Sequence, residues 1–410
     1  MARSALRTAL FMTLAVHAIA QSKITVTVKN PLNIARSSET VVLPANDLRQ
    51  ALSVDDMRRV HVRGTGSSQD SLIQAVDLDG DGRFDQLLFQ TDIGPSETQT
   101  FTLTVGAKQI ADRDQFKAYG RFVRERLDDF AWENDRIAHR MYGKALETWK
   151  AEPLTSSAVD VWSKRTSRLV INDWYMVDDY HRDHGEGADL YSSGPTRGCG
   201  GNGIWTNDKL YPSANFVNSR VIANGPIRVL FELTYPAWDV NGVQVSETKR
   251  ISLDAGQNFD RFESHYTFSG PTQLESAVGI KKTRDSKSEV SRKDGTLRTW
   301  EPLKEGQLGC AIILDPSTVL NNATDNLNYY LTQKIGNDKT TVYYAGFGWT
   351  SSGHFKDVED WDHYVAEFVQ RLRAPLVVTI PQTASENRTR KTLRAAGQSR
   401  NAPPNRVPNP

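Results

Sequence analysis

The feature that most limits the possible folds is a long series of strand-like segments in the second half of the chain. Between Arg220 and Trp349, segments rich in Val, Ile, Phe and Tyr follow one another, separated by turn residues. The pair Asn241-Gly242 lies between two such segments and is a strong hairpin signal, because both residues accept a left-handed backbone. Helical periodicity is rare here. The pattern predicts an all-β fold, a large two-sheet antiparallel sandwich.

A second, smaller group of strand signals precedes this region. Lys23–Lys29 alternates apolar and polar residues, and similar runs occur at 40–43, 59–63 and 98–105. Short strands with turns at this spacing are typical of a small sandwich. We therefore expect a small N-terminal β-sandwich domain over residues 21–110. The large sandwich, which we expect to be catalytic, follows over residues 118–382, with a helix at 361–373 and a closing strand at 376–380.

Both ends of the chain carry segments that we expect to lie outside the folded domains. Residues 1–20 combine a basic start, an apolar run and the small-residue site Ala18-Ile19-Ala20 of a signal peptide cleaved before Gln21. This predicts a secreted or periplasmic protein without membrane insertion, since the apolar run is too short to span a bilayer. Residues 383–410 are rich in Pro, Asn, Arg and Ser, and we expect a disordered tail.

The charge balance and the missing motifs exclude several classes of function. Removal of residues 1–20 takes away two arginines, which leaves 48 of the 50 basic residues against 49 acidic ones. A nearly neutral chain argues against nucleic acid as a partner, because binding phosphates requires a basic excess or stripe. The chain has no Gly-x-Ser-x-Gly elbow, no dinucleotide fingerprint and no phosphate-binding loop.

The two cysteines, Cys199 and Cys310, leave two interpretations open. An exported protein can join them in a disulfide, which would staple the Gly-rich segment around Cys199. Both can equally be small buried thiols.

An acidic segment in the small domain is similar to the start of a calcium-binding loop. Its oxygen-bearing residues match four of the ligand positions of such a loop, and a glycine stands where the loop turns sharply, but Leu88 stands where the bidentate glutamate belongs. A hairpin turn built from Asp and Gly is the simpler interpretation. The possible calcium ligands are Asp77, Asp79, Asp81 and Asp85.

The stretch of greatest chemical interest is Tyr180–Gly187, here called the central loop. It reads Tyr-His-Arg-Asp-His-Gly-Glu-Gly and has no period of 3.6 or 2, so a buried helix or strand is a poor interpretation. A loop rich in His, Gly and acids between strands is typical of a ligand site, although a surface loop is the alternative. His181 and His184 have no third ligand at a fixed local spacing, so zinc is poorly supported.

A second charged stretch, Glu133–Ala138, begins on a predicted strand. A strand that carries so many charges cannot be wholly buried unless they pair or contact a ligand. A network that braces a domain interface is the alternative to substrate contact. The inventory of Tyr, His, Arg, Asn, Trp and carboxylates suits an oligosaccharide or polysaccharide substrate.

Four blocks of sequence resemble one exported bacterial family, the domain of unknown function 4861 family. They are residues 125–138, 180–187, 225–235 and 345–349. The resemblance covers nearly the whole mature chain and implies a galactose-mutarotase-like supersandwich behind a small β domain. It also implies a place in the degradation of uronate-containing polysaccharides, with a lyase-like activity that eliminates water or a sugar from a uronic acid. It implies no assigned catalytic residues.

Elimination from a uronate requires a group that neutralises the carboxylate, a base for the C5 proton and an acid for the departing oxygen. Our hypothesis gives the first role to Arg136 with Asn134, the second to His181 or His184, and the third to Tyr180. Further candidates for substrate binding are Glu133, Asp183, Glu186, Trp205, Lys281, Trp349 and His354.

Two other functions remain open at this stage. A glycoside hydrolase would use a carboxylate pair drawn from Glu133, Asp183 and Glu186, separated by roughly 5–10 Å. A non-catalytic sugar-binding protein would use the same residues without turnover.

Overall fold

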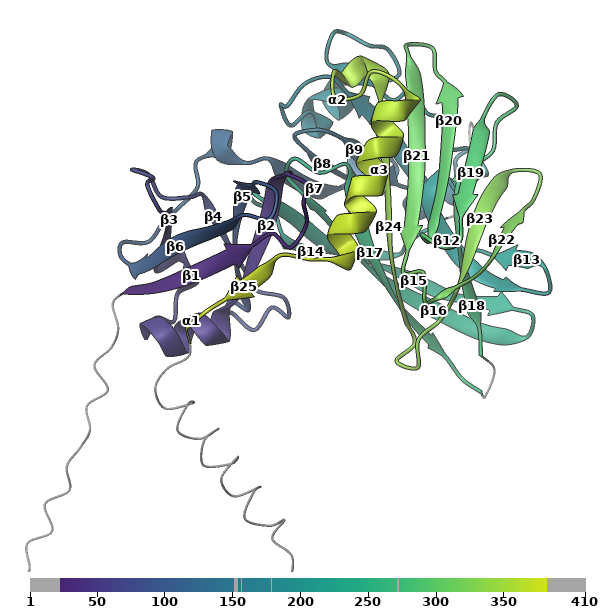
Figure 1. The fold of residues 1–410 in the computed structure, drawn as a ribbon. Coiled ribbons are helices and arrows are strands. Elements are labelled where there is room, and N and C mark those ends of the chain that lie inside the picture. Colours follow the sequence, from purple (N-terminus) through teal and green to yellow (C-terminus); the bar gives the residue numbers. More distant parts are fainter. Residues whose placement is uncertain (1–22, 151–153, 156, 178, 271–272, 382–410) are drawn as a thin grey trace, which may run out of the picture.

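The computed structural model describes residues 23–381, apart from 151–153, 156, 178 and 271–272. The predicted signal peptide and the predicted tail lie outside the described residues. Two bodies are visible in Figure 1, a small one formed mainly by the first hundred residues and a large one formed by the rest. Within the described part of the chain, no helix is long and apolar enough to cross a membrane.

The small domain consists of two sheets that pack face to face around an aliphatic core. Its four-stranded sheet has the order β25-β1-β6-β3, and its three-stranded sheet has the order β2-β5-β4. Val26, Leu43, Leu87 and Leu103 are buried between them. Val26 and Leu103 each lie between two threonines, whose side chains point to the opposite face of the sheet. The elements are β1 (Lys23–Lys29), β2 (Arg36–Pro44), α1 (Ala45–Leu52), η1 (Met57–Arg59), β3 (Val60–Gly64), β4 (Ile73–Val76), β5 (Gln86–Ile93), β6 (Thr98–Val105) and β25 (Val377–Thr379).

One strand of the small domain comes from the far end of the chain. β25 pairs antiparallel with β1, with Thr27 opposite Thr379 and Lys29 opposite Val377. The sequence prediction recognised a strand here but grouped it with the large domain. The pairing partner of a three-residue strand cannot be read from its own sequence, since the register depends on which sheet edge is open.

The large domain is a sandwich of one eight-stranded sheet against two five-stranded sheets. The eight-stranded sheet has the order β14-β15-β16-β17-β24-β21-β20-β19, and all of its pairs are antiparallel. Its strands are β14 (Asn218–Ala223), β15 (Arg228–Val240), β16 (Val243–Asp254), β17 (Phe259–Phe268), β19 (Lys287–Ser291), β20 (Thr296–Pro302), β21 (Gln307–Leu314) and β24 (Thr340–Trp349).

The opposite layer is formed by two sheets, with the orders β11-β10-β9-β8-β7 and β13-β12-β18-β23-β22. An isolated bridge between Val159 and Gly198 joins them. The elements are β7 (Ala118–Val123), β8 (Asp129–Asn134), β9 (Ala138–Met141), β10 (Val159–Lys164), α2 (Ile171–Val177), β11 (Gly187–Ala188), β12 (Cys199–Thr206), β13 (Lys209–Tyr211), β18 (Glu275–Lys281), β22 (Val319–Thr324) and β23 (Asn328–Lys334); short 3₁₀ turns are η2 (Arg113–Gln115), η3 (Arg124–Arg126), η4 (Lys144–Thr148) and η5 (Thr350–Ser352).

The core of the large domain confirms the predicted two-layer sandwich. Phe130, Phe231, Val278 and Tyr343 come from all three sheets and belong to one buried cluster. Asn241 and Gly242 both have positive φ, 52° and 88°, in the β15–β16 hairpin. Cys199 and Cys310 are buried as free thiols in this core, which is the second of the two interpretations left open by the sequence.

The helix α3 (Val358–Arg373) covers the outer face of the eight-stranded sheet. Trp361, Val365 and Phe368 face Phe259 and Ile313 across this contact. Asp357 caps the helix by accepting the amide of Asp360. The helix runs toward the junction of the two domains, so that its last turns face the small domain (Figure 1).

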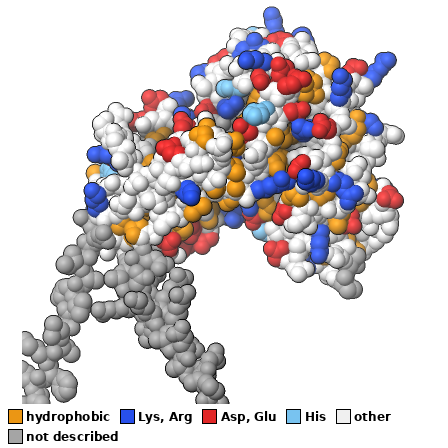
Figure 2. Space-filling model, viewed as in Figure 1, with side chains coloured by type: hydrophobic (Ala, Val, Ile, Leu, Met, Phe, Trp, Pro, Cys, Tyr) orange, Lys and Arg blue, Asp and Glu red, His pale blue; other side chains and the backbone are white. Residues whose placement is uncertain are grey.

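Buried contacts join the two domains. The Gln74 side chain accepts the amides of Ile227 and Arg228 and donates to the carbonyl of Arg228. A Cβ atom on Gly225 would lie 2.4 Å from the Gln74 side chain, so this close approach requires glycine. Figure 2 shows charges of both signs interspersed over the large domain, in keeping with the nearly neutral composition.

Candidate functional site

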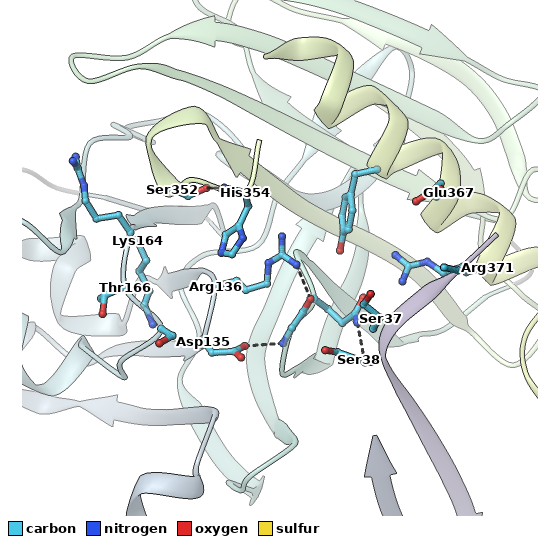
Figure 3. Close-up of a pocket in the computed structure, with 16 residues that line it drawn as sticks. Ser37, Ser38, Asp135, Arg136, Lys164, Thr166, Ser352, His354, Glu367 and Arg371 are labelled. Atoms are coloured by element: carbon cyan, nitrogen blue, oxygen red, sulfur yellow. Dashed lines mark hydrogen bonds between the residues drawn. The ribbon is translucent and has the colours of Figure 1, made fainter. Parts of the chain in front are cut away.

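A cavity of about 530 Å³ lies where the two domains meet, and we call it the interdomain pocket. Six separate segments supply its walls, including the first residues of β2, the β8–β9 turn and the last turns of α3 (Figure 3). Four of its side chains are basic and two are acidic, beside one histidine. The lining residues are Ala35, Ser37, Ser38, Asp135, Arg136, Lys164, Arg165, Thr166, Ser167, Gly256, Gln257, Ser352, His354, Tyr364, Glu367 and Arg371.

Arg136 is the basic residue of this pocket that has no carboxylate partner among the described residues. Its Nη1 donates to the carbonyl of Gly256 at 3.0 Å, and its Nε is buried without a partner. The rings of Phe355 and Tyr364 flank the guanidinium at 5.9 Å. A partly desolvated guanidinium with free donors is suited to binding a carboxylate, because the bidentate pair supplies the missing charge and acceptors.

The turn that presents Arg136 is held by Asn134. Its side-chain oxygen accepts the amides of Arg136 and Ile137, and its nitrogen donates to the carbonyls of Asp254 and Gln257. Asn134 is fully buried and all of these bonds are made within the protein. Asn134 therefore holds the turn in place, and it does not reach a substrate carboxylate as the sequence analysis predicted.

His354 lies beside Arg136 in the pocket (Figure 3). It follows the turn η5, where the Ser352 hydroxyl accepts its backbone amide at 3.2 Å. Partial loss of hydration lowers the pKa of His354, and the positive charge of Arg136 lowers it further, while Asp135 offsets part of the shift. The imidazole is therefore neutral at neutral pH and can accept a proton.

The helix and the small domain complete the pocket. The Tyr364 hydroxyl accepts the amide of Asn258 at 3.0 Å, which leaves its own proton free to donate. Arg371 pairs with Glu39 of the small domain at 2.9 Å. Gln257 donates to the carbonyl of Ser38 at 3.0 Å, so loops of both domains are fixed across the same wall.

Glu133, predicted to contact substrate, lies beneath the pocket in a closed network. It pairs with Lys164 at 2.7 Å and accepts the amides of Val170 and Ile171 at 2.9 Å. Both charged side chains of this pair are fully buried. The carboxylate thus caps the start of α2 and has no free oxygen for a sugar hydroxyl.

The central loop lies outside the interdomain pocket. The side chains of His181 and His184 are 65% and 56% exposed and contact Asp189 and Asp179 respectively. Tyr180 is buried, stacked on Trp162 with ring centroids 5.0 Å apart, and its hydroxyl accepts Arg126 Nε at 2.5 Å. The predicted base and acid therefore do not face a common cavity with Arg136.

Arg165 connects the central loop to the pocket. It lines the pocket, pairs with Asp183 and Glu305, and lies over the ring of Trp349 at 4.9 Å. Burial tends to raise the pKa of Asp183, but the amides of Gly185 and Gly187 and the charge of Arg165 together lower it below its ordinary value.

Four further predicted residues occupy separate places. Glu186 is bound by Arg168 on the surface, and this hydrogen bond lowers the pKa of Glu186. Lys281 is buried between the Tyr191 ring, at 3.8 Å, and Glu301, at 3.6 Å. Trp205 lines a different hollow, on the sheet that contains β12. Trp349 is buried and donates to the carbonyl of Glu305.

Sequence reasoning missed a buried cluster beneath the central loop. Arg140 pairs with Asp160 at 2.7 Å and Asp189 at 3.1 Å, and Asp129 lies 3.6 Å away. Burial raises the pKa of Asp129 to about 7, although Arg140 opposes the shift. Three carboxyls around one guanidinium cannot all be ionised cheaply, so this cluster holds a proton.

The acidic segment of the small domain forms an exposed turn between β4 and β5. Ligand atoms of Asp77, Asp79 and Asp85 gather within 4.8 Å of one another, without Asp81. Asp77 accepts the amides of Gly80 and Gly82, at 2.7 and 2.9 Å. These bonds are those of a self-supporting turn, so calcium remains an untested prediction.

A family assignment follows from comparison with known proteins. The family described as Domain of unknown function (DUF4861) matches residues 28–378. This chain belongs to that family. A relative described as Uncharacterized protein P7, from Formosa agariphila, is 34% identical over 373 residues, which cover 87% of this chain and 93% of the relative.

The comparison with solved structures includes two proteins from Enterococcus faecalis. One is described as a protein in the Glycosyl Hydrolase Family 38 and matches with a TM-score of 0.51 and 10% identity over 88% of this chain and 48% of that protein. The other, described as an alpha-mannosidase, has a TM-score of 0.48 and 9% identity over 89% of this chain and 46% of that protein. The chain spans about half the length of these two proteins. At such low identity, the first match shows the sandwich fold alone.

Proposed function

We propose that this protein is a carbohydrate-active lyase that eliminates water or a sugar from uronic-acid-containing oligosaccharides, and that the interdomain pocket is its active site. One observation carries the proposal: Arg136 has no carboxylate partner among the described residues, and it lies beside His354 in a cavity large enough for a sugar ring. The fold shared with a protein of Glycosyl Hydrolase Family 38 supports a carbohydrate substrate, because that family is named for action on glycosidic bonds.

The chemistry assigns one task to each of three side chains. Arg136 binds the uronate carboxylate and stabilises the negative charge that develops as C5 loses its proton. Neutral His354 takes that proton. The electron pair left at C5 forms the C4=C5 double bond as the C4–O bond breaks, and the Tyr364 hydroxyl protonates the departing oxygen. The products are an unsaturated uronate and either water or a shortened saccharide.

The protonation state of His354 agrees with its proposed task. A base must be deprotonated before it can act, and the neighbouring positive charge lowers the pKa of His354. The same charge is neutralised when a carboxylate binds Arg136, which makes His354 a stronger base in the complex. His181 and His184 have carboxylate neighbours and exposed rings instead.

A hydrolase is the second candidate, because two carboxylates also line the pocket. Asp135 accepts the amide of Gly256 at 2.7 Å, and Glu367 lies 3.1 Å from His363. A pair of carboxyls on either side of a glycosidic bond can act as acid and as base or nucleophile. This candidate needs no free guanidinium, so Arg136 distinguishes the two proposals.

Product analysis separates the candidates. The wild-type protein is incubated with oligouronates of different composition while absorbance is followed near the band of the conjugated product, at about 235 nm. Elimination gives a rising absorbance, and Tyr364→Phe slows it. A flat trace with new reducing ends would favour the hydrolase, and saturable binding without any product would favour a binding protein.

A further inference from the structure

A second hollow of about 530 Å³ lies on the five-stranded sheet β13-β12-β18-β23-β22 of the large domain. In Figure 1, β13, β22 and β23 lie on the side of the large domain that faces away from the small domain. The residues that line this second hollow are all different from those that line the interdomain pocket. They are Trp205, Thr206, Asn207, Asp208, Gln273, Leu274, Glu275, Leu320, Asn321, Asn322, Ala323 and Thr332, and we call this the Trp205 hollow.

The charges of the two cavities differ. The interdomain pocket has four basic lining side chains, whereas the Trp205 hollow has two acidic side chains, Asp208 and Glu275, and no basic one. Lys334 lies opposite Glu275 in the strand register but is not among the lining residues. A uronate or another anion would be repelled here, so a ligand of this hollow carries no negative charge.

The polar groups of the hollow are available to a ligand. Within the described part of the chain, the side chains of Asn207, Gln273, Glu275 and Asn322 make no hydrogen bond to protein, although each lines the hollow. Amides both donate and accept, and carboxylates accept. Vicinal hydroxyl groups, each a donor and an acceptor, fit such a mixture.

Trp205 supplies an oriented aromatic surface beside these groups. Its ring packs against Tyr330 with centroids 5.4 Å apart and an interplanar angle of 50°, which limits the rotamers open to it. The residue is half-buried, so part of the indole remains accessible. A broad aromatic face next to amides and carboxylates combines an apolar contact with directional hydrogen bonds, as a pyranose ring requires.

We infer that the Trp205 hollow is a carbohydrate-binding subsite for a neutral pyranose unit, separate from the interdomain pocket. It holds one part of a saccharide chain while another part, or another chain, occupies the interdomain pocket. Such a second contact raises the effective concentration of substrate without taking part in the reaction. This role does not depend on whether the interdomain pocket acts by elimination or by hydrolysis.

Calorimetry and saturation-transfer NMR test the inference with neutral probes: cellohexaose, xylohexaose, mannohexaose and the hexaose of β-1,4-galactan. Wild-type protein should bind at least one of them saturably. Trp205→Ala should weaken that binding by roughly tenfold or more, because it removes a stacking surface. Trp149→Ala is the matched control. It removes another half-buried tryptophan, which lines neither cavity, and should leave the affinity unchanged.

Asn322→Arg provides a second variant that does not disturb the core, since this side chain is exposed and makes no bond to described residues. It should obstruct the hollow and reduce binding to a similar extent. Circular dichroism and the melting temperature check that each variant folds. Binding of neutral probes that Arg136→Gln abolishes but Trp205→Ala and Asn322→Arg leave intact would place the ligand in the interdomain pocket and overturn the inference. Absence of binding by folded wild-type protein to all four probes would overturn it as well.

Discussion

The central loop and the interdomain pocket contain similar residue types in opposite circumstances. In the central loop, His181 and His184 are exposed and each contacts a carboxylate, and Asp183 and Glu186 are each bound by an arginine. In the interdomain pocket, Arg136 has no carboxylate partner among the described residues and His354 has no carboxylate within salt-bridge distance among them. Functional groups that are already satisfied stabilise a loop, whereas unsatisfied groups beside a cavity can be satisfied by a ligand.

The difference also concerns how each region is assembled. The central loop is one continuous stretch, while the pocket combines segments that lie more than three hundred residues apart in sequence, from Ser37 to Arg371. A concentration of reactive residue types in sequence is therefore a weaker guide than a convergence of scattered residues in space. Four predictions test this comparison.

The largest effect is expected at His354. His354→Gln should reduce the rate of elimination roughly 10²–10⁴-fold, because a positioned base contributes that much. His181→Ala and His184→Ala should each change the rate by less than about twofold, since their rings are exposed and lie outside the pocket. Initial rates near the product band measure all three. A loss confined to the central-loop variants would reverse the comparison.

The pH profile gives the same prediction a second readout. Because the pKa of His354 is lowered, the base stays neutral below its ordinary range, and activity should persist as pH falls through about 6.5. The acid limb of kcat/KM for wild-type protein should therefore lie below pH 6.5 and should vanish from the residual activity of His354→Gln. An acid limb above 6.5 would exclude His354 as the free-enzyme base.

A slightly smaller loss is expected for Arg136→Gln. Removal of the charge that stabilises the developing anion should cost roughly 10²–10³-fold in kcat/KM. Arg168→Gln removes a surface arginine that pairs with Glu186 and Asp173 and serves as the matched control, with no expected loss. Equal losses in both variants would indicate a general effect of charge rather than a specific site.

The third prediction concerns stability and sets a buried pair against an exposed one. Glu133→Ala leaves Lys164 buried without its partner and should reduce the free energy of unfolding by about 3–5 kcal/mol. Glu186→Ala removes an exposed pair with Arg168 and should cost about 0.2–1 kcal/mol. Urea unfolding measures both. A large effect at Glu186 would show that the central loop contributes more to the free energy of unfolding than its exposure predicts.

The smallest effect concerns the buried cluster beneath the central loop. The folded pKa of Asp129, about 7, lies above its ordinary value of 3.8, so the native state keeps a proton that the unfolded chain has released. This contribution to stability is present at low pH and is lost as pH rises through about 7. Asp129→Asn removes the titrating carboxyl group. The loss of unfolding free energy between pH 5 and pH 8 should therefore be smaller in this variant than in the wild type, by on the order of 2 kcal/mol. An unchanged pH dependence would contradict the raised pKa.

Much of the fold could be predicted because its signals are local. The strands Lys23–Lys29 and Thr98–Val105 match their predicted bounds, since the alternation of apolar and polar residues lies within each segment. The short helix α1 was missed because tertiary packing of Leu48 and Leu52, rather than length or helix propensity, stabilises it. The strand β5 also escaped notice behind the acidic turn.

The candidate site could be predicted only in part. Arg136 and His354 were among the sequence candidates, but nothing in the sequence joins residues that are over two hundred positions apart. Tyr364 lies within the predicted helix 361–373, and nothing in the sequence indicates that this residue lines the pocket. Arg371 and Gln257 carry no sequence signal, because they become relevant only where the two domains meet.

The most direct test of the central claim is a crystal structure of the Tyr364→Phe variant with a bound oligouronate. We expect the sugar carboxylate on the Arg136 guanidinium, with C5 of the same sugar within reach of a His354 ring nitrogen. A ligand bound at His181 and His184, with an unoccupied interdomain pocket, would contradict it.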